Sequence, residues 1–134
     1  MARAQARLGG MDGRHATYDD VLAAPEGAVA ELVQGELWLS ARPALAHLRA
    51  QQGLAHALTR RLDHRLRDDG PDVPGGWVVL QEPELWLGGP VGRDPVLVPD
   101  VAAWRVERFP HDAREHGLAV PPDWVCEVRS PHDG

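Results

Sequence analysis

The segment 97-LVPDVAAW-104 is an apolar, strand-like run that carries one acidic residue, Asp100, directly after a proline. A second run of the same character, 124-WVCEVR-129, carries Glu127. A carboxylate within an apolar strand is costly to bury unless another group pairs with it. Two such carboxylates on neighbouring strands are typical of a divalent-cation site or of an acid–base pair. The sequence therefore predicts adjacent strands whose two carboxylates converge on one cleft.

Composition sets broad limits on the class of protein. The chain has 134 residues, 43% hydrophobic and 25% charged, which is ordinary for one soluble domain. Its formal net charge is -6, because 14 arginines and no lysine face 20 acidic residues. That balance argues against bulk electrostatic binding of nucleic acid and leaves room for a local basic patch. A single cysteine excludes an intramolecular disulfide and fits a reducing cytoplasm. No apolar run approaches the length of a membrane span, so we expect no membrane partner.

Local signals predict one domain over residues 17–134, preceded by a flexible tail over residues 1–16. Thr17 and Asp20 have the spacing of a capping box, which predicts a short helix that ends before Pro25. Two alternating runs that meet at Gln34-Gly35 predict a β-hairpin.

Leucines at three- to four-residue spacing predict a long helix from Pro43 to a stop at Gly70-Pro71. A strand is predicted over residues 77–80, and residues 84–87 form its continuation or a neighbour. A polar loop over residues 109–122, with one helical turn near Ala113 to His116, separates the two acidic strands. The fold class that follows is α+β, with a mixed sheet flanked by helices.

Four motifs, in order, resemble one family of bacterial proteins. They are 17-TYDD-20 with 31-ELVQGEL-37, His47 at the start of the long helix, 98-VPDV-101, and 124-WVCEVRSP-131. Together they resemble the Uma-type restriction-endonuclease-like family of the PD-(D/E)XK nuclease superfamily, over residues 17–131. The resemblance implies a restriction-endonuclease-like fold.

The same resemblance implies a nuclease that hydrolyses DNA with Mg²⁺ or Mn²⁺ held by Asp100 and Glu127. Because two or three carboxylates hold such ions loosely, we expect the binding to be weak. Glu31 is then a further acidic contributor to catalysis, and His47 is a substrate contact. Such a cation polarises the scissile phosphate and lowers the pKa of the attacking water. The lysine of the family pattern is replaced by Arg129. Arginine pairs with phosphate but stays protonated and cannot act as a base, so we expect low activity.

The family pattern continues past Ser-Pro with a charged helix and further strands, whereas this sequence stops at Gly134. We therefore expect a C-terminally shortened version of the fold. An uncovered sheet edge with an apolar patch favours association, so a homodimer is the expected state.

Each candidate residue also has a purely structural interpretation. Asp100 fits a turn at the end of a strand, and Glu127 fits an ion pair with a nearby arginine. Glu31 fits a salt-bridged hairpin residue, and His47 fits a surface or packing histidine. The alternative function is a catalytically inactive or truncated relative that acts as a binding or assembly module. A third possibility is an unrelated α+β interaction domain whose acids are structural.

Overall fold

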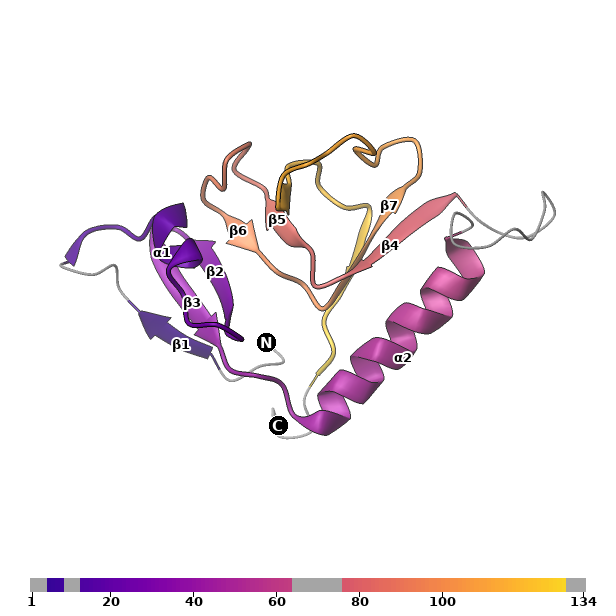
Figure 1. Cartoon of the computed structure of the whole chain (residues 1–134), viewed down its shortest axis with the longest axis horizontal. Helices are drawn as coiled ribbons and strands as arrows, with labels where there is room; N and C mark the ends of the chain where they lie inside the picture. The colour runs from indigo at the N-terminus through magenta and orange to yellow at the C-terminus, as the bar shows by residue number, and fades with distance from the viewer. Residues whose placement is uncertain (1–4, 9–12, 64–75, 130–134) are drawn as a thin grey trace.

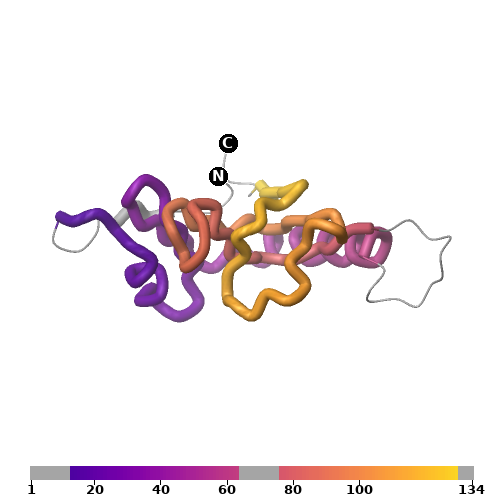
Figure 2. The backbone as a smooth tube through the Cα atoms, turned by 90° about the horizontal axis from the view of Figure 1, so that it is seen from above, coloured from indigo at the N-terminus to yellow at the C-terminus, as the bar shows by residue number. Residues whose placement is uncertain are grey.

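The computed structural model describes residues 5–8, 13–63 and 76–129, which form two sheets and two helices (Figure 1). The predicted α+β class is confirmed. Seen from above, the molecule is elongated, with the N-terminal elements at one end, α2 towards the other and the C-terminal segment across the middle (Figure 2). In chain order the elements are β1 (Gln5–Leu8), α1 (Tyr18–Leu22), β2 (Val29–Val33), β3 (Glu36–Ser40), α2 (Leu45–Leu62), β4 (Trp77–Gln81), β5 (Glu84–Trp86), β6 (Val96–Leu97), β7 (Val101–Arg105), β8 (Gly117–Leu118) and β9 (Trp124–Cys126).

The first sheet has the strand order β1-β3-β2-β6-β5-β8 among the described residues. β2 and β3 form the predicted hairpin, with Leu32 opposite Leu37. Gln34 and Gly35 at its turn both have positive φ, of 53° and 75°, as a tight turn that matches the strand twist requires. β6 pairs antiparallel with β2 and β5, while β5 pairs in parallel with β8. The sheet is therefore mixed, as predicted.

The second sheet contains β4, β7 and β9, with β7 in the centre and all pairs antiparallel. α2 covers one face of this sheet (Figure 1). The buried cluster on that face consists of Ala55, Val79, Val101 and Ala103. Alternation turns Ala102 and Trp104 to the other face, where they pack with Leu85 of β5. β7 is thus buried on both faces, which explains why its sequence is apolar almost throughout.

The run 97-LVPDVAAW-104 is not the single strand that the sequence predicts. Its first part belongs to β6 in the first sheet, and its last part belongs to β7 in the second. Pro99 has no N–H to donate to a ladder, and Asp100 lies in the bend before β7. The three residues 98–100 therefore carry the chain from one sheet to the other.

The strands around Pro83 also differ from the prediction. β5 is neither a continuation of β4 nor its neighbour, because β4 lies in the second sheet and β5 in the first. The predicted helical turn near Ala113 to His116 is absent, and the two-residue strand β8 follows directly. β8 pairs with β5, so the loop after β7 returns to the first sheet.

β1 lies in the segment that the sequence predicts to be a flexible tail. It pairs antiparallel with β3, with Ala6 opposite Leu39. Four residues are too few for strand alternation to stand out in a sequence, and the paired residues lie 29 to 35 positions apart. Residues 1–4 and 9–12 lie outside the described residues, and the domain boundary at residue 17 stays a prediction.

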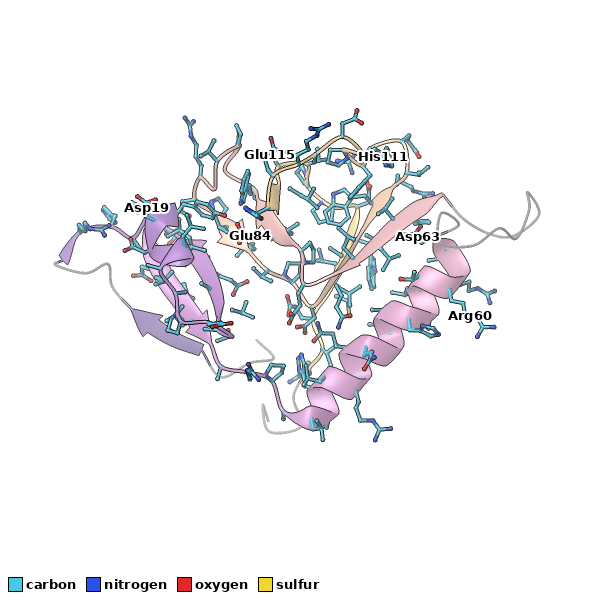
Figure 3. All side chains as sticks on the ribbon, in the orientation of Figure 1. Asp19, Arg60, Asp63, Glu84, His111 and Glu115 are labelled. Atoms are coloured by element: carbon cyan, nitrogen blue, oxygen red, sulfur yellow. The ribbon has the colours of Figure 1, made fainter. Side chains whose placement is uncertain are left out.

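α2 ends at Leu62, because the next residue makes a contact with the sheet. Asp63 has non-helical φ and ψ angles of -102° and 91°, and its buried Oδ2 accepts a hydrogen bond from the Val79 N–H at 3.2 Å. Figure 3 shows Asp63 between the end of α2 and β4. The predicted stop at Gly70-Pro71 lies outside the described residues, as does Leu66, one of the regularly spaced leucines of the predicted helix.

Tyr18 of α1 and Trp86 of β5 share one acceptor, the carboxylate of Glu84. The Tyr18 hydroxyl donates a hydrogen bond to Glu84 Oε1 at 2.5 Å, and the Trp86 indole N–H donates to the same oxygen at 2.7 Å. The two rings meet edge to face, with centroids 5.7 Å apart. A Cβ added to Gly117 of β8 would lie 2.0 Å from the Trp86 ring. The contact fixes α1 and β8 against the same strand.

We expect the chain's single tyrosine to ionise unusually late. Burial, the hydrogen bond to Glu84 and the charge of that carboxylate raise the pKa of Tyr18 from 10.0 to about 12. The phenolate absorbance during an alkaline titration measures this pKa, and Glu84→Gln should return it towards 10.0. Because the folded pKa is raised, the protonated hydroxyl stabilises the fold fully below pH 10.0, and that stabilisation is lost as the pH rises through about 12. A wild-type midpoint near 10.0 would contradict the contact.

Candidate functional site

The carboxylate of Asp100 is fully buried where α2, β7 and β9 meet. Its Oδ2 accepts a hydrogen bond from the Val128 N–H at 2.7 Å, and its Oδ1 lies 3.3 Å from His47 Nε2. The Asp100 carbonyl oxygen accepts hydrogen bonds from the Glu82 N–H at 3.0 Å and from the Gln51 amide at 3.3 Å. The Val128 N–H therefore gives a hydrogen-bond donor to a carboxylate that is costly to bury without a partner, and the His47 ring lies beside it.

α2 presents two polar side chains, His47 and Gln51, to Asp100. Their exposed fractions are 2% and 1%, and their four-residue spacing places them on the same face of the helix. Within the part of the chain that the structure describes, Gln51 Oε1 and both ring nitrogens of His47 have no hydrogen-bond partner, although Nε2 lies close to Asp100 Oδ1. The sequence predicts His47 as a substrate contact, and the structure places it against Asp100 instead of on the surface. Gln51 was not predicted from the sequence as a site residue. Its four-residue spacing from His47 is the signal that places both on one face of the helix.

Glu127 directly follows β9 and is exposed. Val101 of β7 pairs with Cys126 of β9, so Asp100 and Glu127 occupy the next positions outward on the same two segments. The hydrogen bond from the Val128 N–H to the Asp100 side chain joins the two segments beyond the last ladder pair. The two acids are therefore neighbours at one end of the second sheet.

Glu31 and Glu127 line one groove of about 610 Å³, which we call the central groove. Its walls are mainly apolar and come from β2, β3, β5, β6 and the segment around β9. Glu31 Oε1 also accepts a hydrogen bond from the Val98 N–H at 2.9 Å, which ties β2 to the linker before Asp100. Asp100 itself does not line the groove, whereas its neighbour Pro99 does. The structure thus brings Glu31 and Glu127 to one groove and places Asp100 behind its wall.

The pKa of the Cys126 thiol depends on the negative charges at this end of the sheet. Its side chain packs with the buried cluster beneath α2, on the opposite side of β9 from Glu127. Burial raises the pKa of the Cys126 thiol, and the negative charges of Asp100 and Glu127 raise it further. The carboxylates of Asp100 and Glu127 therefore both affect the thiol of Cys126. The thiol stays protonated at neutral pH, as expected of a packing residue and not of a nucleophile.

Arg129 occupies the position where the nuclease pattern has a lysine. It is exposed and, like Glu127, lies beyond the last residue of β9. Strand alternation predicts that Glu127 and Arg129 share a face. Because the regular strand ends at Cys126, alternation does not by itself determine where the Arg129 side chain points.

A comparison with protein families decides the assignment of the chain. Residues 16–134 match the family model described as "Uma2: Putative restriction endonuclease". The chain belongs to the Uma2 family. No curated protein and no solved structure matches it significantly. Uma2 membership confirms the resemblance carried by the four motifs, and it implies a nuclease-like function. In the described part of the chain, neither helix combines the length and apolarity needed to cross a membrane.

Restriction-endonuclease-like families such as Uma2 generally use divalent metal ions, and the donors near Asp100 can be compared with that requirement. Carboxylate oxygens suit hard ions such as Mg²⁺ and Mn²⁺. Within residues 5–8, 13–63 and 76–129, no three His, Cys, Asp or Glu side chains form a group that could hold a metal ion. Mg²⁺ often binds through one or two carboxylates and completes its shell with water and phosphate oxygens. The described donors do not form a closed structural site, so a cation held by Asp100 and Glu127 would take the rest of its shell from water and phosphate oxygens.

Proposed function

We propose that this Uma2 protein is a metal-dependent nuclease that hydrolyses DNA, with Asp100 and Glu127 as ligands of Mg²⁺ or Mn²⁺. The observation that supports it most is the buried Asp100 carboxylate beside Glu127, held by contacts from both α2 and the β9 segment. Burying a carboxylate costs stability, and strongly buried acids concentrate at functional sites. A cation bound there would supply the polarisation of the phosphate and a water of lowered pKa.

The residues around these ligands have separate tasks in the proposal. His47 and Gln51 position Asp100, one through the carboxylate and the other through the carbonyl oxygen. Glu31 adds a carboxylate at the central groove. Arg129 stabilises negative charge on the phosphate, but it cannot accept a proton from water because guanidinium stays protonated. We therefore expect slow hydrolysis and weak cation binding.

The second candidate function is a catalytically inactive Uma2 relative that acts as a binding or assembly module. Two observations favour it: the chain has no lysine, and its described residues contain no group of three metal-binding side chains. An ion pair between Arg129 and Glu127 would close the site to a cation. The inactive module and the nuclease differ in one measurable property: the inactive module would bind DNA without cleaving it.

Cleavage of single- and double-stranded DNA with Mg²⁺, Mn²⁺ or a chelator distinguishes the two functions. We expect slow cleavage that the chelator stops and that Glu127→Gln lowers by about 10²-fold or more, since a cation provides several kcal/mol of transition-state stabilisation. Glu107→Gln is the matched control, because Glu107 is an exposed carboxylate in the turn after β7. Cleavage that Glu127→Gln leaves unchanged would place the active centre elsewhere. Binding without any metal-dependent cleavage would favour the inactive module.

We also propose that the protein acts in the cytoplasm and as a homodimer. The exposed apolar residues Trp124 and Val125 support the dimer, because both lie on β9. β9 is an end strand of the second sheet within the described residues. End strands with apolar side chains favour association with another chain.

A further inference from the structure

α2 is a cationic helix in an acidic protein. Its 18 residues include Arg49, Arg60, Arg61 and two histidines but no acidic residue, although the whole chain has a net charge of -6. Figure 3 shows Arg60 on the side of α2 that faces away from the sheet. Within its own 18 residues, α2 therefore carries arginines and no carboxylate.

A second groove lies between α2 and β4, and we call it the α2–β4 groove. Its volume is about 580 Å³. Five polar side chains line it: Arg49, Gln52, His56 and Thr59 from the helix, and Gln81 from the strand. Each of them donates or accepts hydrogen bonds, and none is negatively charged. The groove is therefore suited to an anionic or strongly polar occupant.

Arg49 is the cation best placed to bind such an occupant. It is exposed, and its guanidinium has no ion pair or hydrogen bond with any residue that the structure describes. From Arg49 to Thr59 the helix rises about 15 Å, at roughly 1.5 Å per residue. One DNA strand places a phosphate about every 3.4 Å along the duplex axis, so this length corresponds to about four phosphates.

The edge of β4 argues against a peptide as the occupant. A peptide would add to this edge by pairing with the outward N–H groups of β4. The Val79 N–H already donates to the Asp63 carboxylate, which lies beside the strand. That contact removes a central hydrogen bond from any added strand. An extended phosphodiester needs no strand ladder and is attracted by Arg49.

The groove runs towards Asp100 at its Arg49 end. Gln81 pairs with Val101, and the Glu82 N–H donates to the Asp100 carbonyl oxygen. On α2, His47 and Gln51 contact Asp100, whereas Arg49, two residues from each, lies on a different face of the helix and lines the groove. We propose that the α2–β4 groove binds the sugar-phosphate backbone of a nucleic acid and directs the strand towards Asp100; this second part rests on the proposed function.

Binding of a fluorescent DNA duplex by the full chain, in chelator and across a range of salt concentrations, tests the groove separately from cleavage. We expect Arg49→Gln to weaken binding on the order of tenfold at about 50 mM monovalent salt. It should also lower the slope of log affinity against log salt by about one. The matched control is Arg93→Gln, because Arg93 is exposed in the loop between β5 and β6 and does not line the groove. Circular dichroism checks that both variants are folded.

Each outcome either supports the groove or overturns it. Equal effects of Arg49→Gln and Arg93→Gln, or no wild-type binding at low salt, would overturn it. A polyglutamate peptide that competes as well as DNA of equal charge would also overturn it, by showing a general acidic-peptide site. Loss of binding specific to Arg49→Gln supports the groove even where the wild type cleaves nothing. Conversely, a cleaving wild type whose DNA binding is unaffected by Arg49→Gln retains the proposed function without the groove.

Discussion

An Asp100→Asn variant should lose metal-dependent DNA cleavage by about 10³-fold, because a bound cation supplies several kcal/mol of transition-state stabilisation. Asparagine has nearly the same shape, and its amide oxygen can accept the Val128 N–H that Asp100 accepts at 2.7 Å. It has no negative charge, so it holds Mg²⁺ or Mn²⁺ poorly. Single-turnover cleavage measures the rate, and calorimetric titration with Mn²⁺ measures the affinity for the cation.

Asp19→Asn is the matched control for this substitution. Asp19 is an exposed residue of α1, remote from α2 (Figure 3), so removing its charge should leave cleavage and Mn²⁺ affinity at the wild-type level. Full cleavage by folded Asp100→Asn would remove Asp100 from the active centre. Equal losses in both variants would show that net charge, and not this carboxylate, controls the reaction.

A Trp104→Ala variant should lower the free energy of unfolding by about 3–5 kcal/mol. Trp104 is fully buried on β7, its indole N–H donates to the Val120 carbonyl oxygen at 2.8 Å, and its ring meets Phe109 edge to face at 5.5 Å. Truncation leaves a cavity between the two sheets and a carbonyl oxygen without its donor. Urea denaturation followed by circular dichroism gives the free energy of unfolding.

Trp124→Ala makes the same change at a side chain that is 39% exposed, and we expect it to cost less than about 1 kcal/mol. A loss of about 3–5 kcal/mol is a large part of the roughly 5–15 kcal/mol that stabilises most domains. Where Trp104→Ala does not fold, Trp104→Phe keeps much of the apolar area and loses only the N–H bond and part of the ring. Equal effects of truncation at Trp104 and Trp124 would contradict the burial of Trp104.

Elements stabilised by neighbours in the sequence were predictable. The hairpin around Gln34-Gly35 follows from alternation and from a turn glycine with positive φ. The start of α1 follows from Asp20, whose carboxylate accepts a hydrogen bond from the Thr17 N–H at 2.8 Å. In both cases the interacting groups lie within a few residues of one another, so the pattern in the sequence contains the physical cause.

Elements that depend on distant partners were not predictable. Nothing near residue 63 shows that α2 ends there, because the cause is the N–H of Val79 on another element. The division of segment 97–104 between two sheets likewise depends on distant pairing partners, because β6 pairs with β2 and β7 pairs with β4. Periodicity describes which face of an element is apolar, but it does not say which sheet buries that face.

The candidate site likewise contains residues that the sequence predicts and residues that it does not. Asp100 and Glu127 stand out in the sequence because charged residues in apolar strands are costly, and their adjacency follows from the β7–β9 register. The burial of His47 against Asp100 depends on how α2 packs on the sheet. Gln51 gives no chemical signal of its own, and only its helical spacing from His47 connects it with the site.

The crossing of the chain between the two sheets has a consequence for how the protein folds. The second sheet takes β4, β7 and β9, whereas β5, β6 and β8 lie between them in the chain and belong to the first sheet. Among the described strands, no continuous fragment therefore contains one complete sheet without at least half of the strands of the other. Closing such non-local pairings slows folding, because loop entropy is lost before the contacts form. We expect both sheets to appear together in one cooperative kinetic phase, and neither half of the chain to fold when expressed alone.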